Sequence, residues 1–140
     1  MSEKPRILVI GAGSIGTVHA QNAATLGQAA IIDQNADVAK EKADQLGIQS
    51  FGSSLEKALQ WQPDGVVVAV PNRFHVPIAE QALAAGVPVM VEKPISMDLE
   101  DATRLVSFAK SRQLPLFVVS NMRFHPAVQV LRQNFTLIGK

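Results

Sequence analysis

Short aliphatic runs alternate along the chain with longer segments in which apolar residues recur every three or four positions. The short runs are bounded by glycine, proline or polar residues, as is typical of strands buried on both faces of a parallel sheet. The periodic segments predict amphipathic helices. The expected strands are Arg6–Ile10, Ala29–Ile32, Ile48–Phe51, Gly65–Val70, Val87–Val91 and Leu116–Val119. The expected helices are Ser14–Leu26, Ala36–Leu46, Ser54–Gln60, Phe74–Ala85, Asp98–Lys110 and Pro126–Gln133.

The alternation of strands and helices implies that the strands pair in parallel through right-handed helical crossovers. The predicted fold class is therefore α/β, with a doubly wound parallel sheet. Residues 1–120 contain all of the expected strands and are expected to form one domain. Residues 121–140 follow the last strand and are expected to form a connecting helix and the start of a second domain.

Several residues mark the expected helix ends. Gly27, Gly47 and Gly86 directly follow three of the helices, where glycine is a common C-cap. Asn72 and Asp98 precede two others, where a short polar side chain can accept hydrogen bonds from free backbone N–H groups. The helix that Asp98 begins is expected to bury the face formed by Leu99, Ala102, Leu105, Val106 and Ala109.

The sequence Gly11-Ala12-Gly13-Ser14-Ile15-Gly16 connects the first strand to the first helix. In this setting the first glycine permits a tight turn, the second lets the backbone approach a pyrophosphate, and the third lets helix and strand pack closely. The helix N-terminus, at Ser14 and Ile15, adds free N–H groups and a partial positive charge. The pattern predicts the dinucleotide-binding loop of a Rossmann domain, although a purely structural glycine turn would also fit it.

Asp33 ends the second strand, about twenty residues after the glycines. A carboxylate there can accept hydrogen bonds from both ribose hydroxyls of an adenosine, and its charge repels a 2′-phosphate. Gln34 follows where an arginine would favour NADP. The cofactor expected from these residues is NAD, and the alternative is a solvated aspartate that begins a turn.

Glu92-Lys93-Pro94 ends the fifth strand. Because ligands of open α/β sheets bind at the carboxyl ends of the strands, Lys93 is placed to point toward a bound cofactor. A lysine beside a glutamate can hydrogen-bond a reacting hydroxyl or stabilise its developing negative charge. Spacing alone fits a surface lysine at a strand end equally well.

These motifs together resemble the Gfo/Idh/MocA family, which is named for glucose–fructose oxidoreductase and inositol dehydrogenase. The resemblance covers the whole chain, and the succession of Pro71-Asn72-x-x-His75 and Glu92-Lys93-Pro94 is its most specific part. The matching residues are Gly11 to Gly16, His19, Asp33, Pro71 to His75, Ala85-Gly86, Glu92 to Pro94 and Arg123 to Pro126.

The resemblance implies a Rossmann domain that binds NAD in an oxidoreductase acting on a sugar, polyol or related hydroxy compound. It implies that Lys93 lies between nicotinamide and substrate and assists hydride transfer. The residues that it places around the cofactor are Gly11, Gly13, Ser14, Ile15, Gly16, Asp33, Pro71, Asn72, His75, Glu92, Lys93, Asn121 and Arg123. The family's second α/β domain, which carries an Asp and His pair, has no counterpart here, so these 140 residues alone are expected to be inactive.

Composition narrows the partners. The formal net charge is +1 and the basic residues are scattered, so neither nucleic acid nor a membrane surface is an expected partner. The sequence has no cysteine, which excludes disulfides and thiolate zinc sites and suits a reducing cytoplasm. The start of the chain does not resemble a signal peptide, and the longest apolar runs are far shorter than a membrane span. No metal site is expected, because the three histidines lack the spacing of metal ligands.

Other readings of the motifs remain. A short-chain dehydrogenase would need a catalytic tyrosine, which the sequence lacks, and a methyltransferase usually has glycine where Ile15 stands. A non-catalytic NAD-binding module, such as a sensor or a partner subunit, stays open, as does a homo-oligomer. His19 is expected to pack locally, and His125 and Trp61 are expected to be structural.

Overall fold

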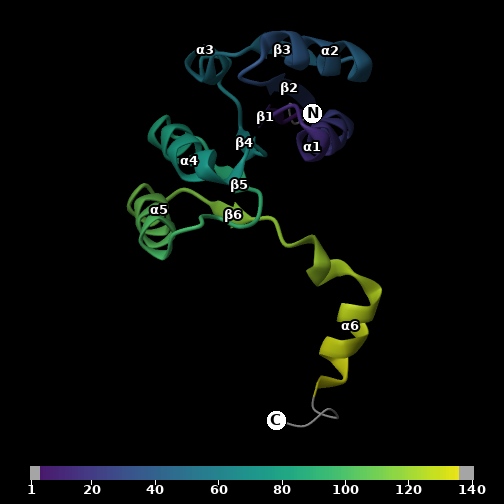
Figure 1. The fold of residues 1–140 in the computed structure, drawn as a ribbon, viewed down its shortest axis with the longest axis vertical. Helices are drawn as coiled ribbons and strands as arrows, with labels where there is room; N and C mark the ends of the chain where they lie inside the picture. Colours follow the sequence, from purple (N-terminus) through teal and green to yellow (C-terminus); the bar gives the residue numbers. More distant parts are fainter. Residues whose placement is uncertain (1–3, 136–140) are drawn as a thin grey trace.

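A six-stranded parallel sheet forms the centre of the molecule, described here by a computed structural model of residues 4–135 (Figure 1). The strands are β1 (Arg6–Ile10), β2 (Gln28–Ile32), β3 (Gln49–Gly52), β4 (Gly65–Val68), β5 (Val89–Val91) and β6 (Leu116–Val118). Their order across the sheet is β3-β2-β1-β4-β5-β6, and every neighbouring pair is parallel. The sheet confirms the predicted doubly wound α/β fold.

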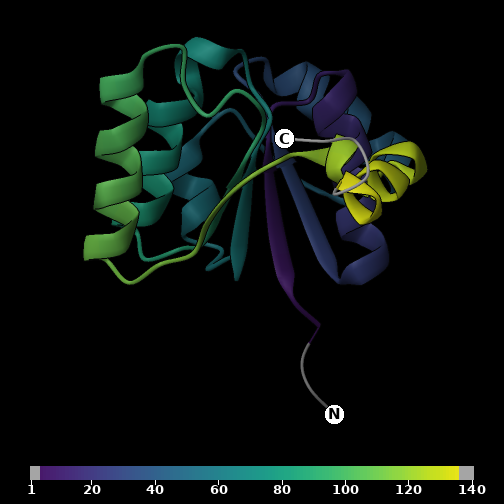
Figure 2. The ribbon, with the colours of Figure 1, turned by 90° about the horizontal axis from the view of Figure 1, so that it is seen from below.

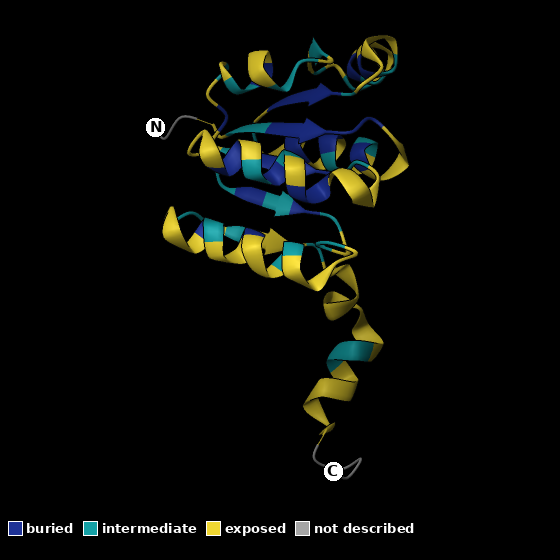
Figure 3. Ribbon diagram, turned by 60° about the vertical axis from the view of Figure 1, so that its left-hand side comes forward, coloured by how far each residue is buried: buried dark blue, intermediate teal, exposed yellow. Residues whose placement is uncertain are grey.

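Helices cover both faces of this sheet (Figure 2). They are α1 (Ser14–Leu26), α2 (Ala36–Leu46), α3 (Leu55–Leu59), α4 (His75–Ala84), α5 (Leu99–Ser111) and α6 (Pro126–Gln133), with 3₁₀ helices η1 (Asn72–Phe74) and η2 (Asn121–Phe124). Alternate residues of β1 point to opposite faces: Val9 packs with α1 and α2, whereas Leu8 and Ile10 pack with α3, α4 and α5. The sheet therefore has two cores, one on each face, and its inner strands β1, β2, β4 and β5 are mostly buried (Figure 3).

Two expected strands begin too early because their first residues end the preceding helix. The Ile48 N–H donates to the Ala43 carbonyl of α2, at 3.0 Å, and the Val87 N–H donates to the Ala82 carbonyl of α4, also at 3.0 Å. These backbone groups are used by helix termini, so β3 begins at Gln49 and β5 at Val89. The expected C-caps Gly27 and Gly47 follow α1 and α2 and donate to the last turns of those helices.

The connection from β4 to α4 also differs from the prediction. The strand ends at Val68 rather than Val70, because the Val70 carbonyl lies 2.9 Å from the Nε2 of His75 instead of in the sheet. A 3₁₀ turn then precedes α4, so Asn72 is not the N-cap of this helix. Its side-chain amide instead donates to the Met97 sulfur, 3.6 Å away.

Helix α5 confirms its predicted N-cap but not all of its predicted buried face. The Asp98 carboxylate accepts the Asp101 N–H at 3.0 Å. Leu105 is fully buried, whereas Leu99 is 83% and Val106 38% exposed. Because α5 covers β5 and the edge strand β6, its buried stripe is narrow and is centred on Leu105 and Ala109.

The chain beyond β6 leaves the sheet. Figure 1 shows η2 and α6 extending away from the other helices, and none of the residues of α6 is buried. A helix is thus present within residues 121–140, where a connecting helix and the start of a second domain are expected, and the last five of these residues lie outside the described part of the chain. None of the helices described within residues 4–135 has both the length and the apolar content needed to cross a bilayer.

Candidate functional site

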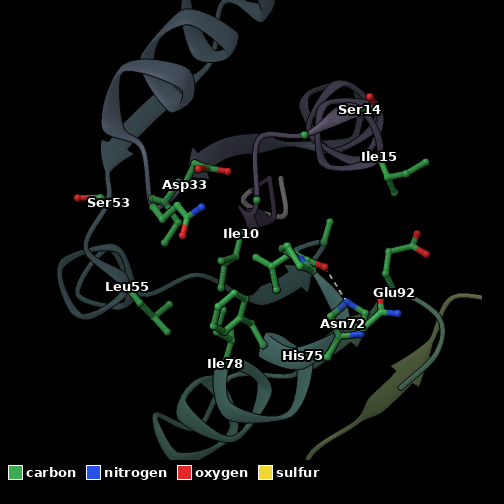
Figure 4. Close-up of a pocket in the computed structure, with 18 of the residues that line it drawn as sticks. Ile10, Ser14, Ile15, Asp33, Ser53, Leu55, Asn72, His75, Ile78 and Glu92 are labelled. Atoms are coloured by element: carbon green, nitrogen blue, oxygen red, sulfur yellow. Dashed lines mark hydrogen bonds between the residues drawn. The ribbon is translucent and has the colours of Figure 1, made fainter. Parts of the chain in front are cut away.

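A pocket of about 730 Å³ lies at the carboxyl ends of the central strands (Figure 4). It lies where β1 and β4 are adjacent and the chain winds outward in opposite directions on their two sides, the usual ligand crevice of such sheets. Its volume is in the range of small-molecule and cofactor sites. The expected site residues that line it are Gly11, Gly13, Ser14, Ile15, Asp33, Pro71, Asn72, His75, Glu92 and Lys93.

The three glycines of the loop between β1 and α1 have different surroundings. Gly11 has a φ of +103°, and a Cβ atom there would lie 2.4 Å from the Ala69 carbonyl oxygen. A Cβ at Gly16 would lie 1.8 Å from the Gly11 carbonyl oxygen. Gly13, by contrast, has an ordinary φ of −70° and nothing within 4 Å of its Cβ position. Contacts within the chain therefore exclude a side chain at Gly11 and Gly16, but they do not exclude one at Gly13.

Helix α1 begins at the pocket without a capping side chain. Its N-cap residue is Gly13, which has no side chain to accept the first N–H groups. Asn35, Ser54 and Asp98 cap α2, α3 and α5, so the sequence supplies such residues elsewhere. The uncapped N–H groups and the helix dipole favour an anion at this end of the pocket.

Asp33 is fixed at the end of β2, on the opposite side of the pocket from Glu92 (Figure 4). Its Oδ2 accepts the Ala12 N–H at 2.8 Å and its Oδ1 accepts the Asn35 N–H at 3.0 Å. A carboxylate has about four acceptor positions, so two remain for further donors such as ribose hydroxyls. The first contact also ties this carboxylate directly to the glycine loop.

Hydrogen bonds hold the Glu92-Lys93-Pro94 turn in place. The Glu92 N–H donates to the Val68 carbonyl at 2.9 Å, which extends the β4–β5 pairing. Its Oε2 accepts the Lys93 N–H at 3.1 Å, and its Oε1 lies 2.8 Å from the Nε2 of His19. The Lys93 side chain is exposed at the pocket.

His75 lines the pocket but is almost entirely enclosed, with 1% of its surface exposed. Its Nδ1 lies 2.7 Å from the Pro94 carbonyl oxygen and its Nε2 lies 2.9 Å from that of Val70. Both ring nitrogens are thus directed at backbone carbonyl oxygens of two loops of the site, and a neutral imidazole, with a single N–H, donates to one of the two.

Sequence reasoning missed most of the apolar and amide-bearing lining of the pocket. The additional lining residues are Ile10, Ile32, Ser53, Leu55, Ala69, Val70, Phe74, Ile78 and Gln81, together with Gln34, which sequence reasoning considered only for cofactor preference. Ile78 and Gln81 lie three positions apart on α4, and Phe74, the N-cap residue of that helix, lies four positions before Ile78, so the three share one side. That spacing, together with the position of α4 directly after a central strand, was the signal that could have identified them.

Three expected cofactor-binding residues do not line the pocket. Gly16 is buried against Gly11, so its part is the close packing of α1 on the loop. Asn121 and Arg123 are exposed on η2, outside the pocket, because the chain turns away from the sheet after β6. Within residues 4–135, no group of three or more His, Asp or Glu side chains is arranged to hold a metal ion.

Comparisons with known proteins agree with this geometry. Residues 5–120 match the GFO_IDH_MocA model, described as an oxidoreductase family with an NAD-binding Rossmann fold. The UDP-N-acetylglucosamine 3-dehydrogenase of Acidithiobacillus ferrooxidans is 40% identical over 126 residues, which are 89% of this chain and 40% of the relative. The inositol 2-dehydrogenase of Corynebacterium glutamicum is 37% identical over 140 residues, 95% of this chain and 41% of the relative.

A solved structure shows the same architecture. The WlbA dehydrogenase from Bordetella pertussis, in complex with NADH and UDP-GlcNAcA, superposes with a TM-score of 0.87 at 26% identity, over 98% of this chain and 41% of that one. The chain thus spans about two fifths of the length of the relatives that it matches. The chain belongs to the Gfo/Idh/MocA oxidoreductase family and has the family's NAD-binding Rossmann fold.

Proposed function

We propose that the pocket binds NAD, with the diphosphate at Gly13 and the N-terminus of α1 and the adenosine ribose at Asp33. The observation that carries this proposal is the surroundings of Gly13. Neither a strained φ nor a close neighbour requires glycine there, whereas both explain Gly11. An external group that must approach the backbone closely accounts for the missing side chain.

The fit extends to both ends of the pocket. The free acceptor positions of Asp33 suit two ribose hydroxyls, and the apolar wall with Leu55 and Ile78 suits the flat face of an adenine. The pocket continues to Glu92 and Lys93, the side on which the nicotinamide would lie.

Cofactor preference tests the proposal directly. We expect tighter binding of NAD(H) than of NADP(H), because a 2′-phosphate would face the Asp33 carboxylate. The repulsion corresponds to roughly 1–3 kcal/mol in a partly solvated site. Titration calorimetry of the chain with both cofactors measures it.

Asp33→Asn is the informative variant, because it removes the charge while keeping an oxygen that can accept one of the two backbone N–H groups. It should narrow the difference between the two cofactors. Equal or tighter binding of NADP(H) by the unaltered chain would contradict the proposal.

For the whole protein, we propose hydride transfer between the cofactor and a sugar, polyol or related hydroxy compound. Two relatives support this proposal, because one is a dehydrogenase of a sugar nucleotide and the other a dehydrogenase of inositol. When bound, NAD accepts or supplies the hydride. The Nζ of Lys93 would hold a proton at the reacting oxygen of the substrate and stabilise its developing negative charge.

In a protein that also carries the family's second domain, Lys93→Ala should lower turnover by about 10²-fold or more. The affinity for NAD should change much less, because Gly13 and Asp33 supply the contacts at the other end. Steady-state kinetics combined with a cofactor titration separates the two effects. Unchanged turnover would contradict this role and would leave Lys93 as a surface lysine at the end of a strand.

We also propose a cellular location, a range of partners and a mode of assembly for the protein. A cytoplasmic location is supported by the absence of cysteine, and a lack of nucleic-acid partners by the net charge of +1. Assembly into a homo-oligomer is supported by large apolar side chains that are exposed beyond the core of the domain. These are Phe117, Met122, Phe124, Val130, Leu131 and Phe135.

A further inference from the structure

Two histidines from distant parts of the chain contact the Glu92-Lys93-Pro94 turn on its two sides. His19 of α1 reaches the residue before Lys93, with its Nε2 2.8 Å from the Glu92 Oε1. His75 of α4 reaches the residue after Lys93, with its Nδ1 2.7 Å from the Pro94 carbonyl oxygen. The tertiary fold brings both rings to the turn, since His19 lies 73 positions from Glu92 in the sequence and His75 lies 19 positions from Pro94.

The contact with His19 is continuous with the backbone of Lys93. Glu92 uses one carboxylate oxygen for the His19 ring and the other for the Lys93 N–H, at 3.1 Å. The side chains of His19 and Glu92 are only 16% and 15% exposed, so water competes weakly for this contact. A movement of the His19 ring would therefore move the acceptor on which the Lys93 backbone rests.

The contact with His75 fixes the other side of the turn. Pro94 has no N–H, so its carbonyl is the backbone group through which this residue can be held. The second ring nitrogen of His75 is 2.9 Å from the carbonyl oxygen of Val70, which lies just after the end of strand β4 at the pocket. A neutral ring donates to one of these two carbonyls: in the tautomer that carries its hydrogen on Nδ1 it holds Pro94, and its other edge packs at the end of a central strand.

We propose that His19 and His75 are positioning residues that together fix the backbone of Lys93 at the pocket. The Lys93 side chain is exposed, while the residues on both sides of it are held by buried or nearly buried groups. In this arrangement the backbone of Lys93 is held in place, while its side-chain ammonium group can move. The inference rests on the proposed function only for the cofactor that Lys93 would face, because the contacts themselves belong to the chain.

Amide exchange of Lys93 in the ¹⁵N-labelled chain, without cofactor, tests the first contact. His19→Ala removes the ring, whereas His19→Gln retains an amide nitrogen near the position of Nε2. We expect exchange of the Lys93 amide to become roughly three- to tenfold faster in His19→Ala, the effect of one lost hydrogen bond, and to stay close to the original rate in His19→Gln. Equal rates in His19→Ala and the unaltered chain would overturn the proposal.

The second contact has its own pair of variants. His75→Asn retains an amide near the Nδ1 that faces Pro94, and His75→Gln retains one near the Nε2 that faces Val70. The Lys93 and Ile95 amide resonances should stay near their positions in His75→Asn and shift in His75→Gln. The reverse order would overturn the part assigned to His75. Should either variant fail to fold, as judged by circular dichroism, the His19 pair still decides the proposal.

A matched histidine control is available in the same chain. The His125 Nδ1 accepts the Ala127 N–H at the start of α6, at 3.2 Å and away from the pocket. His125→Asn preserves a capping acceptor and should leave the Lys93 amide unchanged. If it alters that amide as much as His19→Ala does, the effect is general destabilisation and the proposal fails.

Ligand binding gives a second readout. His19→Ala should weaken NADH binding by a few fold and leave ADP binding unchanged, because ADP lacks the nicotinamide end. Equal weakening of both ligands would contradict a positioning effect confined to Lys93. If the unaltered chain binds neither ligand while the exchange results hold, the proposed function fails and the positioning by histidine stands.

Discussion

At the scale of single residues, the glycines between β1 and α1 lack a side chain for two different physical reasons. Gly11 and Gly16 lie against their own chain, whereas Gly13 lies against open space. The first two make the turn and the close helix contact possible, and the third is free of both constraints. A side chain at Gly13 should therefore affect a ligand and not the fold.

We expect Gly13→Val to abolish NADH binding while the far-UV circular dichroism spectrum stays native. The valine side chain would occupy the space through which a pyrophosphate approaches the backbone. Enhancement of NADH fluorescence on titration measures binding. Gly65→Val is the matched control, because Gly65 also has nothing within 4 Å of its Cβ position but lies outside the pocket. Undiminished binding by Gly13→Val would mean that this loop does not hold the phosphates.

Residues were predictable from sequence where their function follows from local spacing. The glycine loop and Asp33 are of this kind, since both are defined by their distance from the first strand and both line the pocket. The His19–Glu92 contact was not predictable, because it joins residues that only the tertiary fold brings together. His19 was expected to pack locally, and that prediction was wrong for the same reason.

At the scale of the helices and strands, hydrophobic periodicity identified each element but not each buried face. The pattern of α5 gave Leu99 and Leu105 the same weight, although the structure buries only Leu105. A helix at the edge of a sheet has little sheet beneath it, and the pattern does not reveal which helix lies at the edge. The strand order, which does reveal it, depends on the arrangement of all six strands.

Two identical substitutions in α5 should differ in cost. Leu105→Ala removes a fully buried side chain and should destabilise the fold by about 2–5 kcal/mol. Leu99→Ala, at an 83% exposed position, should stay within about 0.5 kcal/mol. Urea unfolding followed by circular dichroism measures both. Similar costs for the two variants would mean that α5 packs differently.

At the scale of the whole molecule, the fold class and the position of the site follow from sequence, because a parallel doubly wound sheet has one ligand crevice. What did not follow is the path of the chain after β6. Asn121 and Arg123 are expected around the cofactor, and in this structure they are exposed on η2, outside the pocket. Local patterns predicted the helix that follows them but contain no information on its direction.

Removal of residues 121–140 should leave both the fold and the cofactor pocket intact. None of the residues of α6 is buried, and every residue that lines the pocket precedes residue 94. The shortened chain should therefore unfold at nearly the same temperature and bind NADH with nearly the same affinity. A clear loss of NADH affinity at an unchanged unfolding temperature would instead place η2 in the cofactor site.

The position of the pocket in the chain has a consequence for biosynthesis. All of its lining residues lie between Ile10 and Lys93, and the last strand of the sheet ends at Val118. Domains fold as units during translation, beginning from the N-terminus. The nascent polypeptide can therefore complete this pocket as soon as the residues up to Val118 have emerged from the ribosome. A segment translated after this domain would then fold beside a pocket that is already formed.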